Sequence, residues 1–191
     1  IITGANPQKT IDELARKMNV SKQNAGRLVM TEQAAFSNAA QRDCFAELGV
    51  EQFEVVETLD SHTCETCGGM DGKYFPMSEF EIGVTAPPFH PNCRGCTCPY
   101  FEDDFGVPGE RAARGGNGKI YYVPGNITYE EWLEQYVKSS PEEMVSYAKV
   151  KNFDGDKKQY KKYKDCLGKS YVPNTFDEFQ NIKYGNVKEY G

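Results

Sequence analysis

The placement of the cysteines is the strongest constraint that this sequence puts on its own fold. Five of the seven cysteines and one of the two histidines fall in two short segments. The first segment carries Cys64 and Cys67, and the second carries His90 and Cys93 with the same spacing of two intervening residues. Two side chains spaced in this way on a tight turn can face one metal ion, and zinc prefers four sulfur or nitrogen ligands in a tetrahedron. The pattern therefore predicts that one zinc ion joins two distant loops.

The predicted zinc ligands are Cys64, Cys67, His90 and Cys93. Cys96 is the first alternative for the fourth ligand, because it and Cys98 follow the second pair closely. Gly68 and Gly69 come directly after the first pair, where we expect a positive φ that glycine tolerates. Four protein ligands leave no position for water, so the predicted site is structural and metal binding contributes to folding rather than to catalysis.

Three other interpretations of the same residues stay open. Cys93 and His90 would act as a catalytic pair if a third group oriented the histidine. Cys64 and Cys67 would act as a redox dithiol, although such motifs belong in a βαβ context. The cysteines would form disulfide bonds in an oxidising compartment, but their odd number and uneven clustering favour metal binding in a reducing one.

A fourth alternative is a metal hydrolase with an open zinc, which needs a bound water and a general base. Asp71, Glu79 and Glu81 are the carboxylates between the two pairs, and each is interpreted more simply as surface charge. The two remaining cysteines, Cys44 and Cys166, are interpreted as small buried hydrophobic residues.

Capping and periodicity predict two N-terminal helices. The first starts at a capping box formed by Thr10 and Glu13. The second begins after the N-cap Ser21, covers residues 22–47 and ends at Gly49. Its predicted apolar face consists of Ala25, Leu28, Val29, Ala35, Phe36, Ala39 and Ala40.

Polar residues interrupt this apolar face. Glu32 lies three residues after Val29 and four before Phe36, where an unpaired buried charge would be costly. It is either solvated at the margin of the face or paired. We expect Thr31 and Glu32 to make a structural polar contact whose partner the sequence does not identify.

In the middle of the chain, the side chains alternate between two faces with a period of two residues, a pattern that predicts β-strands. Residues 52–59 form the first strand, and short strands are expected at 72–75 and 97–101. Residues 106–118 are expected to form a loop rich in glycine and charge. One side of the first strand carries Phe53, Val55, Glu57 and Leu59.

Short helices are expected in the C-terminal third of the chain. Helix starts are predicted at Thr128, Ser140 and Thr175, and a helix near residues 157–167 ends at Gly168. A run of lysines there is interpreted as a solvated helix face. The predicted fold is therefore α+β, with long helices packed on a small zinc-stapled β-rich unit and a C-terminal string of short helices. The expected domains are residues 1–50 with the long helix, 51–138 with the zinc site, and 139–191 with the short helices.

Charge and hydropathy exclude some classes of function. The chain has 28 acidic and 22 basic residues, a net charge of −6, whereas nucleic-acid-binding domains usually carry a basic face. No stretch approaches the roughly 18 apolar residues of a membrane helix, so we expect a soluble protein without a membrane partner. Because the sequence begins at Ile1 and not at a methionine, we also expect a piece of something longer.

Three stretches resemble a known family in both order and spacing. They are RLVMTEQAAFSNAAQ, GVEQFEVVETLDSHTCETCGGMDGKYFP and APPFHPNCRGCTCPYFED, and together they are similar to the phage head-morphogenesis family, the Mu F-like minor head proteins. The resemblance extends from about residue 10 to residue 136. The motif positions are Arg27, Thr31, Glu32, Cys64, Cys67, Asp71, Gly72, His90, Pro91, Cys93 and Arg94. The extra Cys96 and Cys98 depart from the family pattern, and Cys96 is therefore the alternative fourth ligand.

The resemblance implies a structural, non-enzymatic minor capsid protein. Such a protein acts in head assembly, DNA packaging or ejection, with portal and capsid proteins as partners. It would lie in the capsid interior of the virion, and in the host cytoplasm during assembly. The later stretches NITYEEWLEQYV and YKKYKDCLGKSYVPNTFDEFQNIKY resemble the tails of minor capsid proteins in prophages of Gram-positive bacteria.

An alternative function is DNA binding by a helix-turn-helix next to a structural zinc site. Residues 10–29 have the pattern of two helices joined by a short turn. The second helix is expected to run far beyond the length of a recognition helix, and it offers few basic residues to a groove. A regulator would select one DNA sequence strongly, whereas only weak, salt-dependent DNA affinity is expected of a packaged protein.

Overall fold

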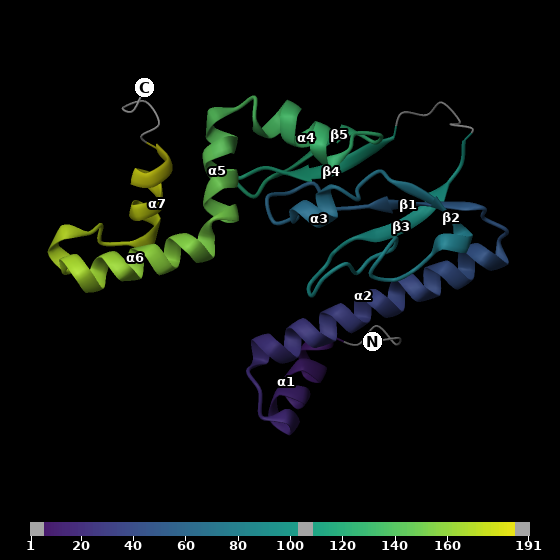
Figure 1. The fold of residues 1–191 in the computed structure, drawn as a ribbon, viewed down its shortest axis with the longest axis horizontal. Helices are drawn as coiled ribbons and strands as arrows, with labels where there is room; N and C mark the ends of the chain where they lie inside the picture. The colour runs from purple at the N-terminus through teal and green to yellow at the C-terminus, as the bar shows by residue number, and fades with distance from the viewer. Residues whose placement is uncertain (1–5, 103–108, 186–191) are drawn as a thin grey trace. The chain divides into compact units, whose positions relative to one another are not determined.

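The computed structural model describes residues 6–102 and 109–185 (Figure 1). It mixes helices with two small sheets, so the predicted α+β class is confirmed. The described residues fall into two units. The first is drawn from Ile1–Thr58, Thr63–Glu110 and Pro124–Tyr129, and the second from Leu59–His62, Arg111–Val123 and Glu130–Gly191.

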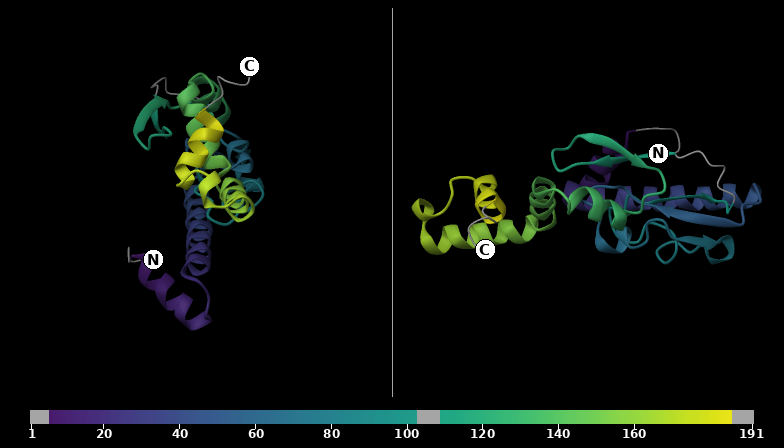
Figure 2. Two further views of the ribbon diagram at one scale, coloured as in Figure 1. Left: turned by 90° about the vertical axis from the view of Figure 1, so that its left-hand side faces the viewer. Right: turned by 90° about the horizontal axis from the view of Figure 1, so that it is seen from above.

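Helix α1 spans Pro7–Met18 and starts four residues earlier than predicted, since its N-cap is Asn6 and not Thr10. Asn6 caps it by accepting a hydrogen bond from the Gln8 amide, and Pro7 occupies the first helical position. This asparagine–proline pair is a strong helix start, so Thr10 lies inside the helix and its predicted capping box is wrong. The helix lies beside the N-terminal part of α2 (Figures 1 and 2).

Helix α2 spans Lys22–Glu47, with the predicted bounds. Ser21 accepts from the Asn24 amide at 3.1 Å, and Gly49 follows the helix with a φ of +70°. The predicted apolar face is wrong in part, because Leu28 and Phe36 are 46% and 71% exposed. The buried residues of α2 are Ala25, Val29, Asn38 and Phe45.

The buried face differs from the predicted one because the two ends of α2 have different packing partners. Ala25 and Val29 pack against Ile11 and Ala15 of α1. Phe45, near the other end, packs on the sheet. The middle of the helix faces a polar loop, so its buried residue there is Asn38.

A three-stranded antiparallel sheet forms the centre of the first unit. Its strands are β1 Gln52–Val56, β2 Tyr74–Pro76 and β3 Cys96–Tyr100, in the order β2-β1-β3 (Figure 1). The three predicted strands are therefore present, with β1 ending earlier than expected. Its predicted inward side is confirmed, since Phe53 and Val55 are fully buried and pack with Phe45 and Ala86.

A hairpin replaces much of the loop that was predicted at residues 106–118. Strand β4 spans Glu110–Arg114 and pairs with β5, Ile120–Pro124, while residues 106–108 lie outside the described residues. The glycines form the turn of the hairpin and not a long loop. The Gly118 amide donates to the Gly115 carbonyl at 2.9 Å, and Gly118 has a φ of +78°.

Three of the C-terminal helices begin where the capping pattern predicts, and the helix expected near residues 157–167 begins earlier, at Phe153. They are α4 Tyr129–Trp132, which continues into the π-helical turn Leu133–Val137, then α5 Pro141–Lys151, α6 Phe153–Leu167 and α7 Phe176–Gly185. Ser140 accepts from the Glu143 amide, and Thr175 and Glu178 form a reciprocal capping box.

A buried ionic contact joins α6 to α7. Asp156 is 1% exposed and accepts hydrogen bonds from Lys183 at 2.7 Å and Gln180 at 2.9 Å. Burial acts to raise the pKa of Asp156, but these hydrogen bonds outweigh it and lower that pKa. The neighbouring lysines Lys157, Lys158, Lys161 and Lys162 are exposed, as a solvated helix face requires.

Candidate metal site

The first half of the site is a short helix that begins at a cysteine. Cys64 is the N-cap of α3, Glu65–Gly68, and its Sγ accepts from the Cys67 amide at 3.4 Å. This turn places both thiols on one side, as their spacing predicts. Gly68 and Gly69 do not have the expected positive φ. Gly68 is needed for another reason, because a Cβ there would collide with the Tyr129 ring.

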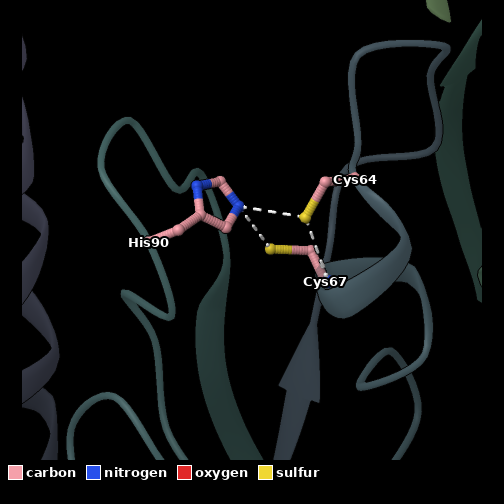
Figure 3. A group of neighbouring side chains, drawn as sticks. All are labelled: Cys64, Cys67 and His90. Carbon is pink, nitrogen blue, oxygen red and sulfur yellow. Dashed lines mark hydrogen bonds between the residues drawn. The ribbon is translucent and has the colours of Figure 1, made fainter.

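The second half of the site is the turn from His90 to Cys93. The Cys93 amide donates to the His90 carbonyl at 3.1 Å, and Asn92 between them adopts a left-handed φ of +63°. His90 Nδ1 lies 2.8 Å from the Pro91 carbonyl. This hydrogen bond orients the ring, with Nε2 facing the two cysteines of the first half (Figure 3).

The donor atoms of the two halves converge. His90 Nε2 lies 3.1 Å from both Cys64 Sγ and Cys67 Sγ, and Cys67 Sγ lies 3.6 Å from Cys93 Sγ. In a tetrahedral zinc site, bonds of about 2.3 Å to sulfur and 2.0 Å to nitrogen place neighbouring donors roughly 3.5–3.8 Å apart. The structure brings Cys64, Cys67 and His90 together as one potential metal-binding group, whereas Cys93 groups with Cys67 and Glu57, so the four predicted ligands do not form a single group. By type, the thiol and imidazole donors present fit a zinc ion.

Glu57 adds a carboxylate that the sequence analysis did not assign to the site. Its Oε1 lies 4.0 Å from Cys93 Sγ, and the carboxylate forms a second potential metal-binding group with Cys67 and Cys93. Gly95 permits this approach, because a Cβ there would collide with the carboxylate. The signal in the sequence was the inward alternation of residues 53–59, which places Glu57 at 5% exposure.

The electrostatics of the group favour an ionised Cys93. A hydrogen bond from Cys67 lowers the pKa of the Cys93 thiol to about 5, and the same contact, with burial, raises the pKa of Cys67. Burial, followed by the nearby Cys93, raises the pKa of Glu57 to about 7. Because zinc ligates thiolates, metal binding is expected to release the Cys67 proton.

The other cysteines lie outside this cluster of donors. Cys96 is exposed and its thiol lies 3.8 Å from the Val56 carbonyl, while Cys98 is half-buried. Cys44 and Cys166 are exposed, so their interpretation as buried hydrophobic residues is wrong. Both lie on the outer faces of helices, where a small thiol needs no packing partner.

Asp71 is not surface charge, as was expected, but a buried structural acceptor. It is 6% exposed, and its two carboxylate oxygens accept from the backbone amides of Glu57 and Tyr129, both at 2.7 Å. Gly72 follows with a φ of +76°, and its amide donates to the Val55 carbonyl. The Asp-Gly-Lys motif thus ties the first cysteine turn to β1. Glu79 and Glu81 are exposed, as expected.

Thr31 of α2 has the polar contact that the sequence could not identify. Its hydroxyl donates to the Arg27 carbonyl at 2.7 Å and accepts from the Asn92 amide at 3.1 Å. The helix therefore holds the turn that carries His90 and Cys93. Glu32 itself is exposed, so the expected contact belongs to Thr31 alone.

Replacing Thr31 with valine is expected to lower the free energy of unfolding by about 1 kcal/mol, the usual contribution of one hydrogen bond. Valine keeps the shape of threonine but cannot accept from Asn92. Thr31→Ser keeps the hydroxyl and is the matched control. Urea titrations of the three proteins measure the difference, and equal midpoints for Thr31→Val and the parent would show that this contact does not stabilise the turn.

Residues 1–98, just over half of the chain, match the family described as Phage Mu protein F like protein. The chain belongs to this Mu F-like family. The resemblance drawn from the cysteine motifs is thereby confirmed, although the matched residues end at Cys98 and the extension to residue 136 stays a prediction. All five donors of the candidate site lie within the matched residues of this Mu F-like chain.

Two further comparisons gave no match for the Mu F-like chain, one with curated proteins and one with solved structures. Family membership supports a head-morphogenesis protein associated with the virion and in contact with other virion components. Among the residues that the structure describes, no helix combines the length and apolar character that crossing a membrane requires.

Proposed function

We propose that the chain is a non-enzymatic minor component of the phage head that acts in head assembly, DNA packaging or ejection near the portal. Its partners are portal and capsid proteins, and its place is the capsid interior, with the host cytoplasm as its location during assembly. The single observation that carries the proposal is the match of residues 1–98 to the Mu F-like family.

In this proposal a zinc ion held by Cys64, Cys67, His90 and Cys93 stabilises the first unit. The apolar core around β1 is small, so a metal bond between two loops adds stability that packing alone supplies poorly. The ion would join the α3 turn, which follows β1, to the turn that α2 holds through Thr31. Cys96 stays the alternative fourth ligand.

In this proposal each of three consecutive segments of the chain has its own role. Residues 1–50 supply the long helix, 51–138 hold the zinc site, and 139–191 form short helices for contact with a partner. Catalysis is not part of the proposal, because four protein ligands leave zinc no open position. Asp71, one of the nearby carboxylates, is already bound to two backbone amides.

DNA binding through α1 and α2 is the competing function. Two candidate contact residues at the start of α2 make contacts within the protein, since Lys22 pairs with Asp12 at 2.8 Å and Arg27 donates to Asn24 at 3.1 Å. These contacts and the net charge of −6 support at most weak binding to packaged DNA.

Purification of phage heads from cells that make this protein tests the proposal. We expect the protein to copurify with heads in a low and constant copy number, measured by quantitative mass spectrometry against the major capsid protein. Its absence from heads would contradict the proposal. Selection from a random DNA library tests the competing function. Enrichment of one sequence by orders of magnitude would favour the helix-turn-helix function instead.

A further inference from the structure

Helix α6 carries the densest group of basic residues in the chain. Residues 139–191 hold ten basic and eight acidic residues, whereas residues 51–138 hold six basic and fifteen acidic ones. The negative charge of the chain therefore lies in its middle, and the positive charge of the C-terminal part is concentrated on one helix. We call this surface the lysine face of α6, and its residues are Lys157, Lys158, Lys161, Lys162 and Lys164.

The lysine face points away from the side of α6 that packs against α7 (Figure 1). The buried residues of α6 are Asp156 and Tyr160. At about 100° per residue, the five lysines occupy an arc of roughly 160° around the helix axis, and neither buried residue falls in it. Asp154 and Asp165 fall in this arc but lie in the first and last turns. The turns between them present lysine alone to solvent.

The lysine face has no carboxylate partner among the residues that the structure describes. Lysines elsewhere do form ion pairs, such as Lys17 with Glu13 and Lys183 with Asp156, both at 2.7 Å. No such pair, and no unprinted contact of this kind, involves the lysine face. Its positive charge is therefore not neutralised within the described part of the chain.

The spacing of these lysines works against the helix that carries them. Lys157 and Lys161 are four residues apart, as are Lys158 and Lys162, so each pair places two like charges side by side. Like charges at this spacing destabilise a helix by about 0.2–0.5 kcal/mol a pair. A face that served only to keep the helix in water would be more stable with alternating charges. The concentration of one sign therefore points to an anionic ligand.

The composition of the lysine face favours a nucleic-acid backbone over a protein. The centres of protein–protein interfaces are depleted of lysine and rich in aromatic residues, and no apolar residue falls in the arc of the lysine face. Seven helical residues separate Lys157 from Lys164, about 10.5 Å along the axis. One strand of duplex DNA presents a phosphate every 3.4 Å or so along its axis, so about four phosphates lie within reach of this row.

We propose that the lysine face of α6 binds the phosphate backbone of double-stranded DNA without selecting a sequence. The choice of DNA as the polyanion rests on the proposed role in the phage head. The surface lies outside residues 1–98, so it belongs to the C-terminal helices of this chain and not to the part that matches the Mu F-like family. It also differs from the start of α2, which a helix-turn-helix would use.

Fluorescence anisotropy of short labelled duplexes, titrated with the full chain, tests this inference. Two duplexes of unrelated sequence should bind equally. With about four phosphate contacts, the association constant should fall roughly a hundredfold between about 50 and 200 mM salt, a log–log slope of about −3.6. A variant with both Lys158→Gln and Lys162→Gln should bind both duplexes more weakly and reduce the slope by about two.

A variant with both Lys73→Gln and Lys119→Gln is the matched control. It removes the same charge from two exposed lysines outside α6, so it should keep the affinity and the salt slope of the parent. Because Lys158 and Lys162 are exposed and make no ion pair, their replacement should also keep the melting temperature, measured by circular dichroism. Weaker DNA binding by a variant that melts with the parent is therefore an effect on the binding surface.

Equal affinity and salt slope for the α6 variant and the parent would overturn the inference. Loss of binding with Lys22→Gln and Arg27→Gln, but not with the α6 variant, would assign DNA binding to α2 and overturn it as well. So would a parent that ignores DNA but self-associates at low salt through the same lysines, measured by sedimentation. Copurification with phage heads is scored separately, so absence from heads contradicts the proposed function and leaves this result in place.

Discussion

Cys67→Ser is expected to abolish zinc binding and to lower the melting temperature of the protein by about 10 °C or more. Cys67 is the thiol that both potential metal-binding groups share, and it is only 2% exposed. When free zinc exceeds its dissociation constant a thousandfold, binding adds about 4 kcal/mol to the free energy of unfolding. In a chain of this length, 1 kcal/mol corresponds to roughly 2–4 °C. Calorimetry and metal analysis of the purified variant measure both effects.

Two further cysteine variants make this result specific. Cys166→Ser changes an exposed thiol of α6 and should keep both the metal and the melting temperature. Cys96→Ser tests the alternative fourth ligand and should also keep one zinc per chain. Retention of stoichiometric zinc by Cys67→Ser would contradict the proposed site, and loss of zinc from Cys96→Ser, with retention in Cys93→Ser, would replace Cys93 by Cys96.

Asp71→Ala is expected to lower the free energy of unfolding by about 4 kcal/mol, a large effect for a residue that touches no metal. The change leaves the backbone amides of Glu57 and Tyr129 without their acceptor, and each buried unsatisfied donor costs about 1–3 kcal/mol. Because these amides belong to separate segments of the first unit, the carboxylate holds them together. Urea denaturation measured with zinc present gives the difference directly.

Asp71→Asn and Glu79→Ala are the controls for this prediction. Asparagine keeps one acceptor oxygen but turns an amide donor toward the second N–H, so it should restore only part of the stability. Glu79 is exposed on the same segment, and its removal should change the free energy of unfolding by less than about 0.5 kcal/mol. An Asp71→Ala protein as stable as Glu79→Ala would show that Asp71 does not act as this acceptor.

The sequence predicted the helix caps and the first cysteine turn correctly, because each depends only on residues within three positions of one another. Ser21, Ser140 and Thr175 cap helices where expected, because a side chain that accepts from an amide three residues later needs nothing from the rest of the fold. The spacing of Cys64 and Cys67 placed two thiols on one turn for the same reason. That this turn meets the turn at His90 was predicted because a tetrahedral zinc ion needs four ligands and each turn supplies only two.

Long-range contacts account for what the sequence could not predict. Asp71 was interpreted as surface charge because its partners, the amides of Glu57 and Tyr129, are backbone groups without a sequence signature. Phe36 was expected in the core because its spacing from Val29 fits a helical face, but neither α1 nor the sheet extends over it. Its exposure at 71% therefore depends on where the packing partners of α2 end.

X-ray absorption at the zinc edge of the purified protein tests the central claim most directly, namely that one ion joins the two cysteine-containing turns. The proposed site predicts one zinc per chain with three sulfur neighbours at about 2.3 Å and one nitrogen neighbour at about 2.0 Å. A shell that contains oxygen in place of sulfur would contradict it, as would a protein that binds no zinc and keeps its full thermal stability in strong chelator.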